Sequence, residues 1–473
     1  MNRNNWWDRR PSLVIYPEIN IISKGVDENE ISYIKNYFKE FYLTLSEYFH
    51  EYESKVYIYK ENSLEFKNGF DIPFGVILNP VLLGEISKEI LISSNDEDEV
   101  FYQTLREKLP EVYPPLGISV GRDLLKISPS PHPNFINVIF IRDENDFILN
   151  LPYHRKVSLF RMLMAKIGAF KNIIIPYKFS KNELQVFGFI LSTMEGGCPI
   201  LKDIKELGKR LRIFGSCKEV GGYIRREDIV ISHERWVNSP VVNSVINLGK
   251  YLGEVQLLSP PVRINSLVRD ERLGRFISAI LSYSRQAEGA FMAYEPFLDL
   301  FIVTASGKYN VDKSNLNFSD LVPIFPTSNG KVEVFKIENI DLKGPSVEAE
   351  EFTLPFKEIS SKIPPIIGII HLHRGLEYFD SSLILEIPQD LEKYPPVGCG
   401  VDLMHAMSRY AIFYAVEKKQ QNSEYKLAVF SVPNHGTNIY CFYEEEILEN
   451  PFYYFVKFIE EGKLKFKFEV NQI

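Results

Sequence analysis

The sequence contains few cysteines, and none of them form a closely spaced pair. The four cysteines, Cys198, Cys217, Cys399 and Cys441, are scattered over 473 residues without a C-x-x-C motif. Cysteine-based metal sites and disulfide frameworks are marked by such spacings, so we expect four free thiols. We therefore interpret them as thiols rather than as disulfides or a cysteine-based metal site.

Long apolar runs and basic runs are also missing. No stretch of about 18 consecutive apolar residues occurs, so no membrane-spanning helix is expected. Residues 1–10 carry Trp6, Trp7 and Asp8 in place of an apolar signal core, which indicates a cytoplasmic protein. The net charge is −8, and no segment is rich in lysine or arginine. Nucleic-acid binding requires a basic surface, so neither a nucleic acid nor a membrane is expected as a partner.

Length and composition indicate a soluble globular protein of more than one domain. A chain of 473 residues exceeds one ordinary hydrophobic core, so two or three domains are expected. Hydrophobic residues make up 45% and charged residues 25% of the chain, which is typical of soluble folded proteins.

The N-terminal half alternates strand-like and helix-like segments. Apolar residues recur at helical spacing from about Glu28 to Phe49, and a second helix is expected from Pro199 to Leu211. Runs of strand length occur at 74–78, 137–141, 172–175 and 186–191. This alternation predicts an α/β domain of unknown fold. Gly196-Gly197 could cradle a phosphate, but the pair fits neither nucleotide-binding motif and favours a tight turn.

A proline-rich interruption marks the expected domain boundary. A helix is predicted from Val242 to Leu252, and Ser259-Pro260-Pro261 then breaks the pattern. We therefore expect an uncharacterised α/β domain at 1–258 and a second domain at 262–473, a length typical of a single domain.

The second half contains an apolar run, Pro364 to Ile370, that ends in His371-Leu372-His373. Side chains two residues apart on a strand point to the same face, so the two imidazoles should lie side by side. Such a pair forms half of a zinc site. By itself, the pattern fits a polar strand end equally well.

Four short motifs follow one another in this half. They are Thr304-Ala305-Ser306-Gly307, Pro345-Ser346-Val347-Glu348, His371-Leu372-His373 and Asn434-His435-Gly436. Their order and intervals resemble the class II aldolase/adducin family over residues 262–473. The resemblance implies an α/β/α sandwich around a mainly antiparallel sheet.

The same resemblance implies roles for particular residues. His371, His373 and His435 correspond to the ligands of Zn²⁺ or another divalent metal. Glu348 corresponds to the catalytic acid/base. The residues implied to contact the substrate are Thr304, Ser306, Gly307 and Ser346. Although an acidic run such as Glu348 to Glu351 is typical of a solvated surface, the match at Pro345-Ser346 favours a catalytic role for Glu348.

The function that the resemblance implies is a zinc-dependent, aldolase-like lyase. It would act on a sugar or sugar phosphate through a metal-stabilised enediolate, and the family commonly forms homo-oligomers. Two family residues that help to hold phosphate are replaced here, by Ala290 and Val347, so a non-phosphorylated substrate is equally open. The alternatives are an epimerase or dehydratase on the same scaffold, or a non-catalytic, adducin-like interaction module.

Overall fold

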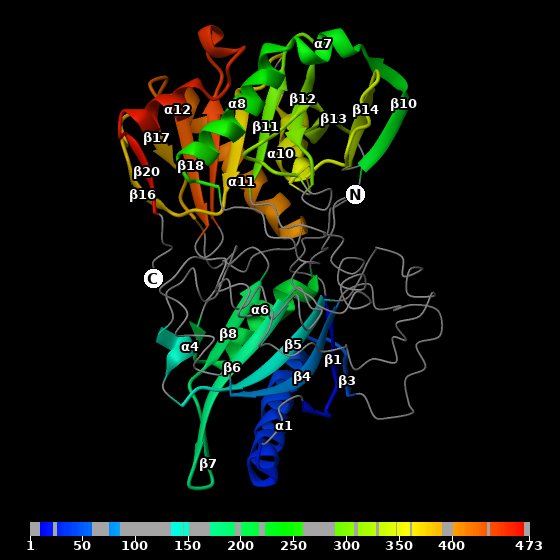
Figure 1. The fold of residues 1–473 in the computed structure, drawn as a ribbon, viewed down its shortest axis with the longest axis vertical. Coiled ribbons are helices and arrows are strands. Elements are labelled where there is room, and N and C mark those ends of the chain that lie inside the picture. Colours follow the sequence, from blue (N-terminus) through cyan, green and yellow to red (C-terminus); the bar gives the residue numbers. More distant parts are fainter. Residues whose placement is uncertain are drawn as a thin grey trace.

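The protein is a mixed α/β structure with two large sheets and a two-domain-like organisation. The computed structural model describes residues 10–21, 26–58, 75–85, 134–144, 146–150, 171–193, 200–216, 223–258, 289–306, 311–327, 331–346, 348–359, 362–389, 401–432 and 436–467. Each of the two large sheets has nine strands, and Figure 1 shows the sheets as separate bodies.

The first sheet is mainly parallel. Its strands are β1 (Ser12–Ile15), β2 (Asn20–Ile21), β3 (Val56–Ile58), β4 (Gly75–Glu85), β5 (Asn134–Arg142), β6 (Lys171–Ser180), β7 (Glu183–Val186), β8 (Phe189–Thr193) and β9 (Ile200–Leu201). The order is β3-β1-β4-β5-β6-β8-β9, with β2 paired to β4 and β7 to β6. Pairing is parallel from β3 through β6 and antiparallel at β7, β8 and β9. The strands predicted at 137–141 and 172–175 are confirmed, and residues 75–78 lie in β4. The run at 186–191 is divided between the end of β7 and the start of β8.

The predicted first helix is also confirmed, as α1 (Glu28–Glu51). Asp27 caps it by accepting a hydrogen bond from the Asn29 N–H at 3.0 Å. The apolar stripe that includes Ile34, Phe38 and Leu45 is buried. It belongs to the core that α1 shares with α6 (Ile204–Ser216), while α4 (Phe147–Asn150) is a single turn.

Two details of the first sheet differ from the sequence prediction. The first of these strands was expected at 74–78, but β4 continues through Pro80 to Glu85. β1 pairs with β4 up to Leu78 and β2 resumes at Val81, so the missing N–H of Pro80 breaks no ladder bond on that side. Ile200 was expected in a helix, but it pairs with β8 in β9, and α6 begins at Ile204.

The second sheet is mainly antiparallel. Its order is β10-β14-β13-β12-β11-β15-β19-β18-β17, and only the two edge pairs, β10–β14 and β17–β18, are parallel. The strands are β10 (Tyr223–Ile231), β11 (Ala290–Glu295), β12 (Leu300–Thr304), β13 (Leu321–Pro326), β14 (Val332–Ile337), β15 (Ile366–Leu372), β17 (Ile384–Glu386), β18 (Leu427–Val432) and β19 (Gly436–Phe442). A separate pair joins β16 (Leu376–Phe379) and β20 (Leu464–Phe466).

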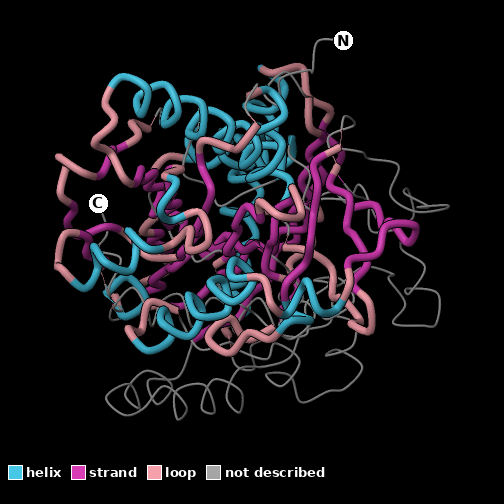
Figure 2. Tube along the Cα trace, turned by 90° about the horizontal axis from the view of Figure 1, so that it is seen from above, coloured by secondary structure: helices cyan, strands magenta, loops and turns pink. Residues whose placement is uncertain are grey.

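Helices lie on both faces of this second sheet. They are α7 (His233–Val237), α8 (Pro240–Glu254), η6 (Phe318–Asp320), α10 (Ala349–Thr353), η7 (Leu354–Glu358), α11 (Val401–Gln421), η8 (Glu445–Ile447) and α12 (Tyr453–Glu460). α8 packs on β11, whereas α10 and α11 pack on each other and against β13, β14 and β19. Viewed from above, helices flank the strands (Figure 2).

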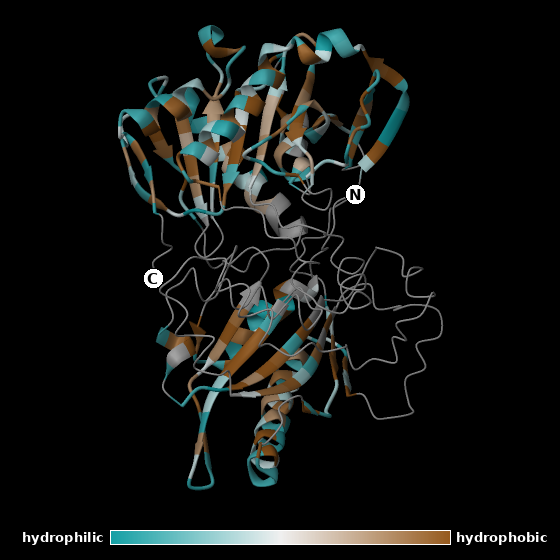
Figure 3. Cartoon of the chain, viewed as in Figure 1, coloured by the Kyte–Doolittle hydropathy of each residue, from teal (hydrophilic) through white to brown (hydrophobic). Residues whose placement is uncertain are grey.

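Hydropathy follows this layering. The strands of both sheets are mostly apolar, and polar residues lie along the outer surfaces of the helices (Figure 3). β11, β15 and β19 are buried along their whole length, as expected for central strands covered on both faces. Among the residues that the structure describes, no helix is long and apolar enough to cross a membrane.

Strand pairing groups residues 223–254 with the second sheet. β10 is an edge strand of that sheet, and the Trp236 indole N–H of α7 donates to the Phe318 carbonyl oxygen at 3.2 Å. The expected division at 258 and 262 would place these elements in the first domain. Within the described residues, the change from one sheet to the other falls between Ser216 and Tyr223.

Candidate active site

Two histidines lie side by side at the end of β15. The His371 side chain is buried, and His373, just beyond the strand, is half-buried. Their ring centroids are 4.9 Å apart, and the ring planes are inclined by 80°. The strand alternation that predicted neighbouring imidazoles is therefore confirmed.

Asn438 holds the ring of His371 from the neighbouring strand. It lies directly opposite His371 in the β15–β19 ladder, and its Oδ1 is 2.6 Å from Nδ1 of His371. An amide oxygen only accepts hydrogen bonds, so Nδ1 of His371 must carry the hydrogen. In the neutral imidazole, Nε2 then has the lone pair, as a metal ligand or a general base requires.

Tyr440 extends this contact towards α11. The Asn438 Nδ2 amide donates to the Tyr440 hydroxyl at 3.4 Å, and the Ser408 hydroxyl is also hydrogen-bonded to it. The Tyr440 side chain is fully buried, and this burial raises the pKa of its phenol above the ordinary value. Tyr440 is therefore a neutral hydrogen-bonding group at physiological pH.

Glu351 in α10 lies at the far end of these contacts. It accepts a hydrogen bond from Ser408 at 3.2 Å and is only 3% exposed. Burial, and then the nearby charge of Glu348, raise the pKa of Glu351 well above its usual range. Glu350 is also buried, so these two acids do not form the solvated surface that is typical of such a run.

Glu348 lies beside the end of β12. Its carboxylate accepts a hydrogen bond from the Ser346 hydroxyl. The Ser346 N–H donates to the Thr304 carbonyl oxygen at 3.0 Å, and Ala305 forms a β-bridge with Pro345. The two predicted motifs at 304–307 and 345–348 are thus brought together by backbone pairing.

A buried lysine accompanies Glu348. Lys313 is 4% exposed, and its ammonium group donates to the Thr304 hydroxyl at 3.3 Å. Burial lowers the pKa of Lys313 to about 8, while the charges of Glu348 and Asp320 act in the opposite direction. Asp320 is itself paired with Lys343. The group around Glu348 therefore combines the Lys313 amine with the carboxyl groups of Glu348 and Glu351.

The remaining predicted site residues have structural contacts or lie outside the described part. The Thr304 side chain is fully buried and also accepts from the Phe291 N–H at 3.2 Å. Ser306 is buried, and its N–H donates to the Gly344 carbonyl oxygen at 2.9 Å. Gly307 and His435 lie outside the described residues, so their roles stay predictions.

The two histidines fit part of a ligand set for a divalent metal. Imidazole nitrogens are ordinary zinc ligands, and a hydrogen bond to the other ring nitrogen is the usual way to orient them. Within the described ranges, no group of three or more histidine, cysteine, aspartate or glutamate side chains is placed to hold a metal ion. Gly436, which follows His435, lies so close that a β-carbon there would be 3.0 Å from the His373 Cα.

Sequence reasoning missed the buried polar groups that lie around Glu348 and His371. They are Lys313, Glu351, Ser408, Asn438 and Tyr440. Asn438 gave a usable signal, because it is a polar residue inside the otherwise apolar strand 436–442. The others carry no local signal, since their importance depends on partners that are distant in sequence.

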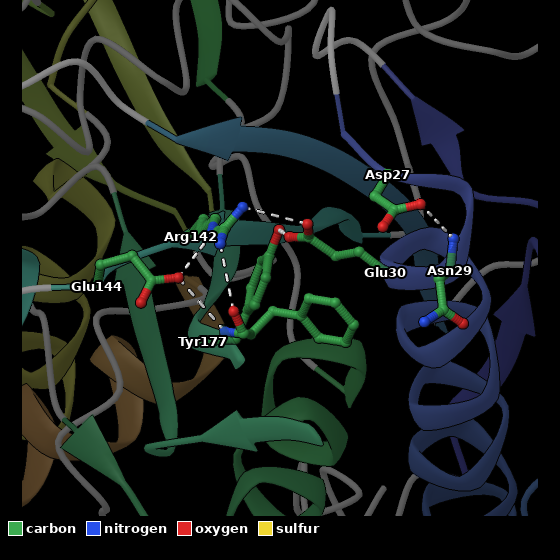
Figure 4. Close-up of polar contacts among 7 residues, drawn as sticks. Asp27, Asn29, Glu30, Arg142, Glu144 and Tyr177 are labelled. Carbon is green, nitrogen blue, oxygen red and sulfur yellow. Dashed lines mark hydrogen bonds and ion pairs between the residues drawn. The ribbon is translucent and has the colours of Figure 1, made fainter. Parts of the chain in front are cut away.

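A second polar cluster lies at the end of the first sheet (Figure 4). Glu30 of α1 is buried, accepts from the Tyr177 hydroxyl at 2.8 Å and pairs with Arg142 at 3.3 Å. Arg142 also contacts Glu144 at 2.6 Å and the Phe179 carbonyl oxygen at 3.2 Å. These groups satisfy one another, so the cluster joins α1 to β5 and β6 and is not a candidate site.

A comparison of the chain with protein-family models, curated proteins and solved structures finds no match.

Proposed function

We propose that residues 223–467 form a divalent-metal-dependent lyase of the class II aldolase type, acting beside the carbonyl group of a sugar or sugar derivative. The observation that carries this proposal is the pair His371 and His373, with Asn438 directing the Nε2 lone pair of His371. A mainly antiparallel sheet with helices on both faces supports the proposal but is not specific to it.

In this proposal the metal is held by His371, His373 and His435. Three neutral imidazoles leave a zinc ion its full charge and an open position, as catalytic sites require. The ion supplies polarisation of a substrate carbonyl oxygen. The position of Gly436 against the backbone of Leu372 and His373 supports including His435, because the two residues are adjacent in sequence.

Glu348 and Glu351 have different roles in proton transfer. Burial favours the neutral form of Glu351, whereas Lys313 places a positive charge near Glu348. Glu348 is thus the group suited to accept a proton from the carbon next to a carbonyl. Its hydrogen bond from Ser346 holds the carboxylate in place. In this proposal the Thr304 hydroxyl holds the Lys313 ammonium group. Ser306 contributes its backbone hydrogen bond to Gly344.

Proton exchange in heavy water tests the proposal. Metal-loaded protein is mixed with a panel of free and phosphorylated ketoses, and loss of the carbon-bound proton is followed by NMR. We expect exchange or cleavage with at least one member of the panel. The Glu348→Gln variant should be slower by roughly 100- to 10,000-fold, the usual contribution of a general base.

Glu358→Gln is the matched control, because Glu358 is an exposed acid paired with Arg409. Its rate should equal that of the wild type. Equal rates for Glu348→Gln and wild type, or no turnover of any ketose, would contradict the proposal. The second result would favour the non-catalytic, adducin-like module. Product analysis separates cleavage from epimerisation and dehydration.

A further inference from the structure

We propose that Asn438 and Tyr440 are positioning residues for His371, joined to it in a hydrogen-bond chain that fixes the imidazole tautomer, with Ser408 and Glu351 buried beyond Tyr440. The tautomer itself follows from the geometry alone. The consequence for metal affinity rests on the proposed function.

The direction of the chain is set at its first link. Because Oδ1 of Asn438 accepts from Nδ1–H of His371 at 2.6 Å, the Asn438 amide nitrogen points away from the imidazole. That nitrogen is a donor only, and its partner at 3.4 Å is the Tyr440 hydroxyl. The Tyr440 oxygen is thereby used as an acceptor.

Ser408 and Glu351 lie beyond Tyr440. Ser408 is hydrogen-bonded to the Tyr440 hydroxyl. Ser408 in turn donates to Oε1 of Glu351 at 3.2 Å. The direction of donation is therefore set over the first two links, from the imidazole through Asn438 to Tyr440.

Because the hydrogen-bond chain is buried, it determines the tautomer of His371. All five side chains are at most 3% exposed, so water is excluded as an alternative partner. Moving the hydrogen of His371 to Nε2 would bring the Nδ1 lone pair against the lone pairs of Asn438 Oδ1. In a buried site the lost hydrogen bond and the repulsion are not relieved by solvent. The chain therefore keeps the hydrogen on Nδ1 and the lone pair on Nε2.

Nitrogen NMR of ¹⁵N-histidine-labelled full-length protein tests the tautomer directly. Spectra are recorded on metal-free protein at about pH 8, where histidine with an ordinary pKa near 6.5 is neutral. The His371 signals are assigned by their loss in His371→Gln. We expect a protonated Nδ1 and an unprotonated Nε2 in the wild type, and a measurable Nε2–H population in Tyr440→Phe.

Matched variants separate positioning from general destabilisation. Tyr454→Phe removes a hydroxyl that donates to Glu444 at 3.0 Å, outside the chain, and should leave the His371 signals unchanged. Asn438→Asp keeps an acceptor towards Nδ1 and should retain the wild-type tautomer, whereas Asn438→Leu should lose it. An Nε2–H tautomer in the wild type, or identical spectra for Tyr440→Phe and Tyr454→Phe, would overturn the inference.

Zinc titration of the same proteins tests the consequence for metal binding. Residues that orient a metal-ligating histidine typically contribute about 10- to 100-fold in affinity, and we expect a loss of that order in Tyr440→Phe. Tyr454→Phe should bind as the wild type does. If the wild type binds no zinc while the tautomer result holds, the proposed function fails and the positioning chain stands. A full-affinity Tyr440→Phe that has changed tautomer would refute the link to metal binding.

Discussion

Lys313 is an ammonium group placed inside the protein, next to two acids and a hydroxyl. Burial lowers its pKa to about 8 from the ordinary value of 10.5, although Glu348 and Asp320 favour its charged form. The folded protein therefore binds the proton of Lys313 less tightly than the unfolded chain does. Below about pH 8 the residue destabilises the fold, and this penalty disappears as the pH rises to 10.5.

This pH dependence is testable with Lys313→Met. At pH 7 the variant should be more stable than the wild type by up to roughly 3 kcal/mol, since one pKa unit corresponds to about 1.4 kcal/mol. The advantage should shrink as the pH rises from about 8 to 10.5. The measurement is the free energy of unfolding in urea at several pH values.

Lys331→Met removes an exposed lysine and serves as the control. It should show no such trend. A constant difference between Lys313→Met and wild type over that pH range would contradict the account of Lys313.

Among the individual residues, the histidine pair was predicted from the sequence, but the groups that surround it were not. His371 and His373 follow from strand alternation, a rule that depends only on neighbouring residues. The burial of Lys313 and Glu351 depends on which elements fold over them. A run of acids such as Glu348 to Glu351 is more often exposed, and in the structure it includes the most strongly perturbed carboxyl group of the site.

The pairing of the central strands β11, β15 and β19 sets the position of the two histidines. Gly289, just before β11, has a φ of +75°, and a β-carbon there would lie 2.5 Å from the His371 carbonyl oxygen. Glycine is therefore needed both for the backbone conformation and for the close approach of β11 to β15. This backbone contact keeps His371 in register beside Ala290.

Gly289→Ala should consequently destabilise the protein by roughly 1–3 kcal/mol, the usual range for a strained backbone position. It should also disturb the His371 signals in the NMR experiment, because the clash is with the His371 backbone. Gly375→Ala is a suitable comparison, since its β-carbon would meet nothing closer than 3.8 Å and its φ is not positive. A Gly289→Ala variant as stable as Gly375→Ala would contradict this role.

Helices and strands were predicted correctly where the hydrophobic periodicity was strong. The predictions were wrong where pairing with a distant strand determined the secondary structure. α1 has a clear apolar stripe and a capping aspartate, and the helix predicted from about Glu28 to Phe49 spans Glu28–Glu51. Ile200 and Leu201 continue an apolar helical pattern but pair with β8 instead. Pro80 is tolerated inside β4 because β1 and β2, which pair with the same side of β4, leave a gap beside it. Neither outcome can be predicted from residues that are adjacent in sequence.

Over the whole molecule, the two sheets carry different kinds of polar clusters. In the first, Glu30, Arg142 and Tyr177 satisfy one another and join α1 to the sheet. In the second, the polar chain converges on an imidazole whose Nε2 is suited to bind an electrophile. We therefore propose that the activity of the protein lies in the unit of the second sheet, which includes β10 and the helices α7 and α8 that contact it.

Metal analysis of the purified full-length protein is the most direct test of the central claim. After saturation with zinc and removal of excess, the wild type should retain about one ion per chain, as expected for a three-histidine site. His373→Ala should retain essentially none. His50→Ala, which alters an exposed histidine on α1, should match the wild type. Wild type without zinc, or equal zinc in wild type and His373→Ala, would contradict the proposed metal site.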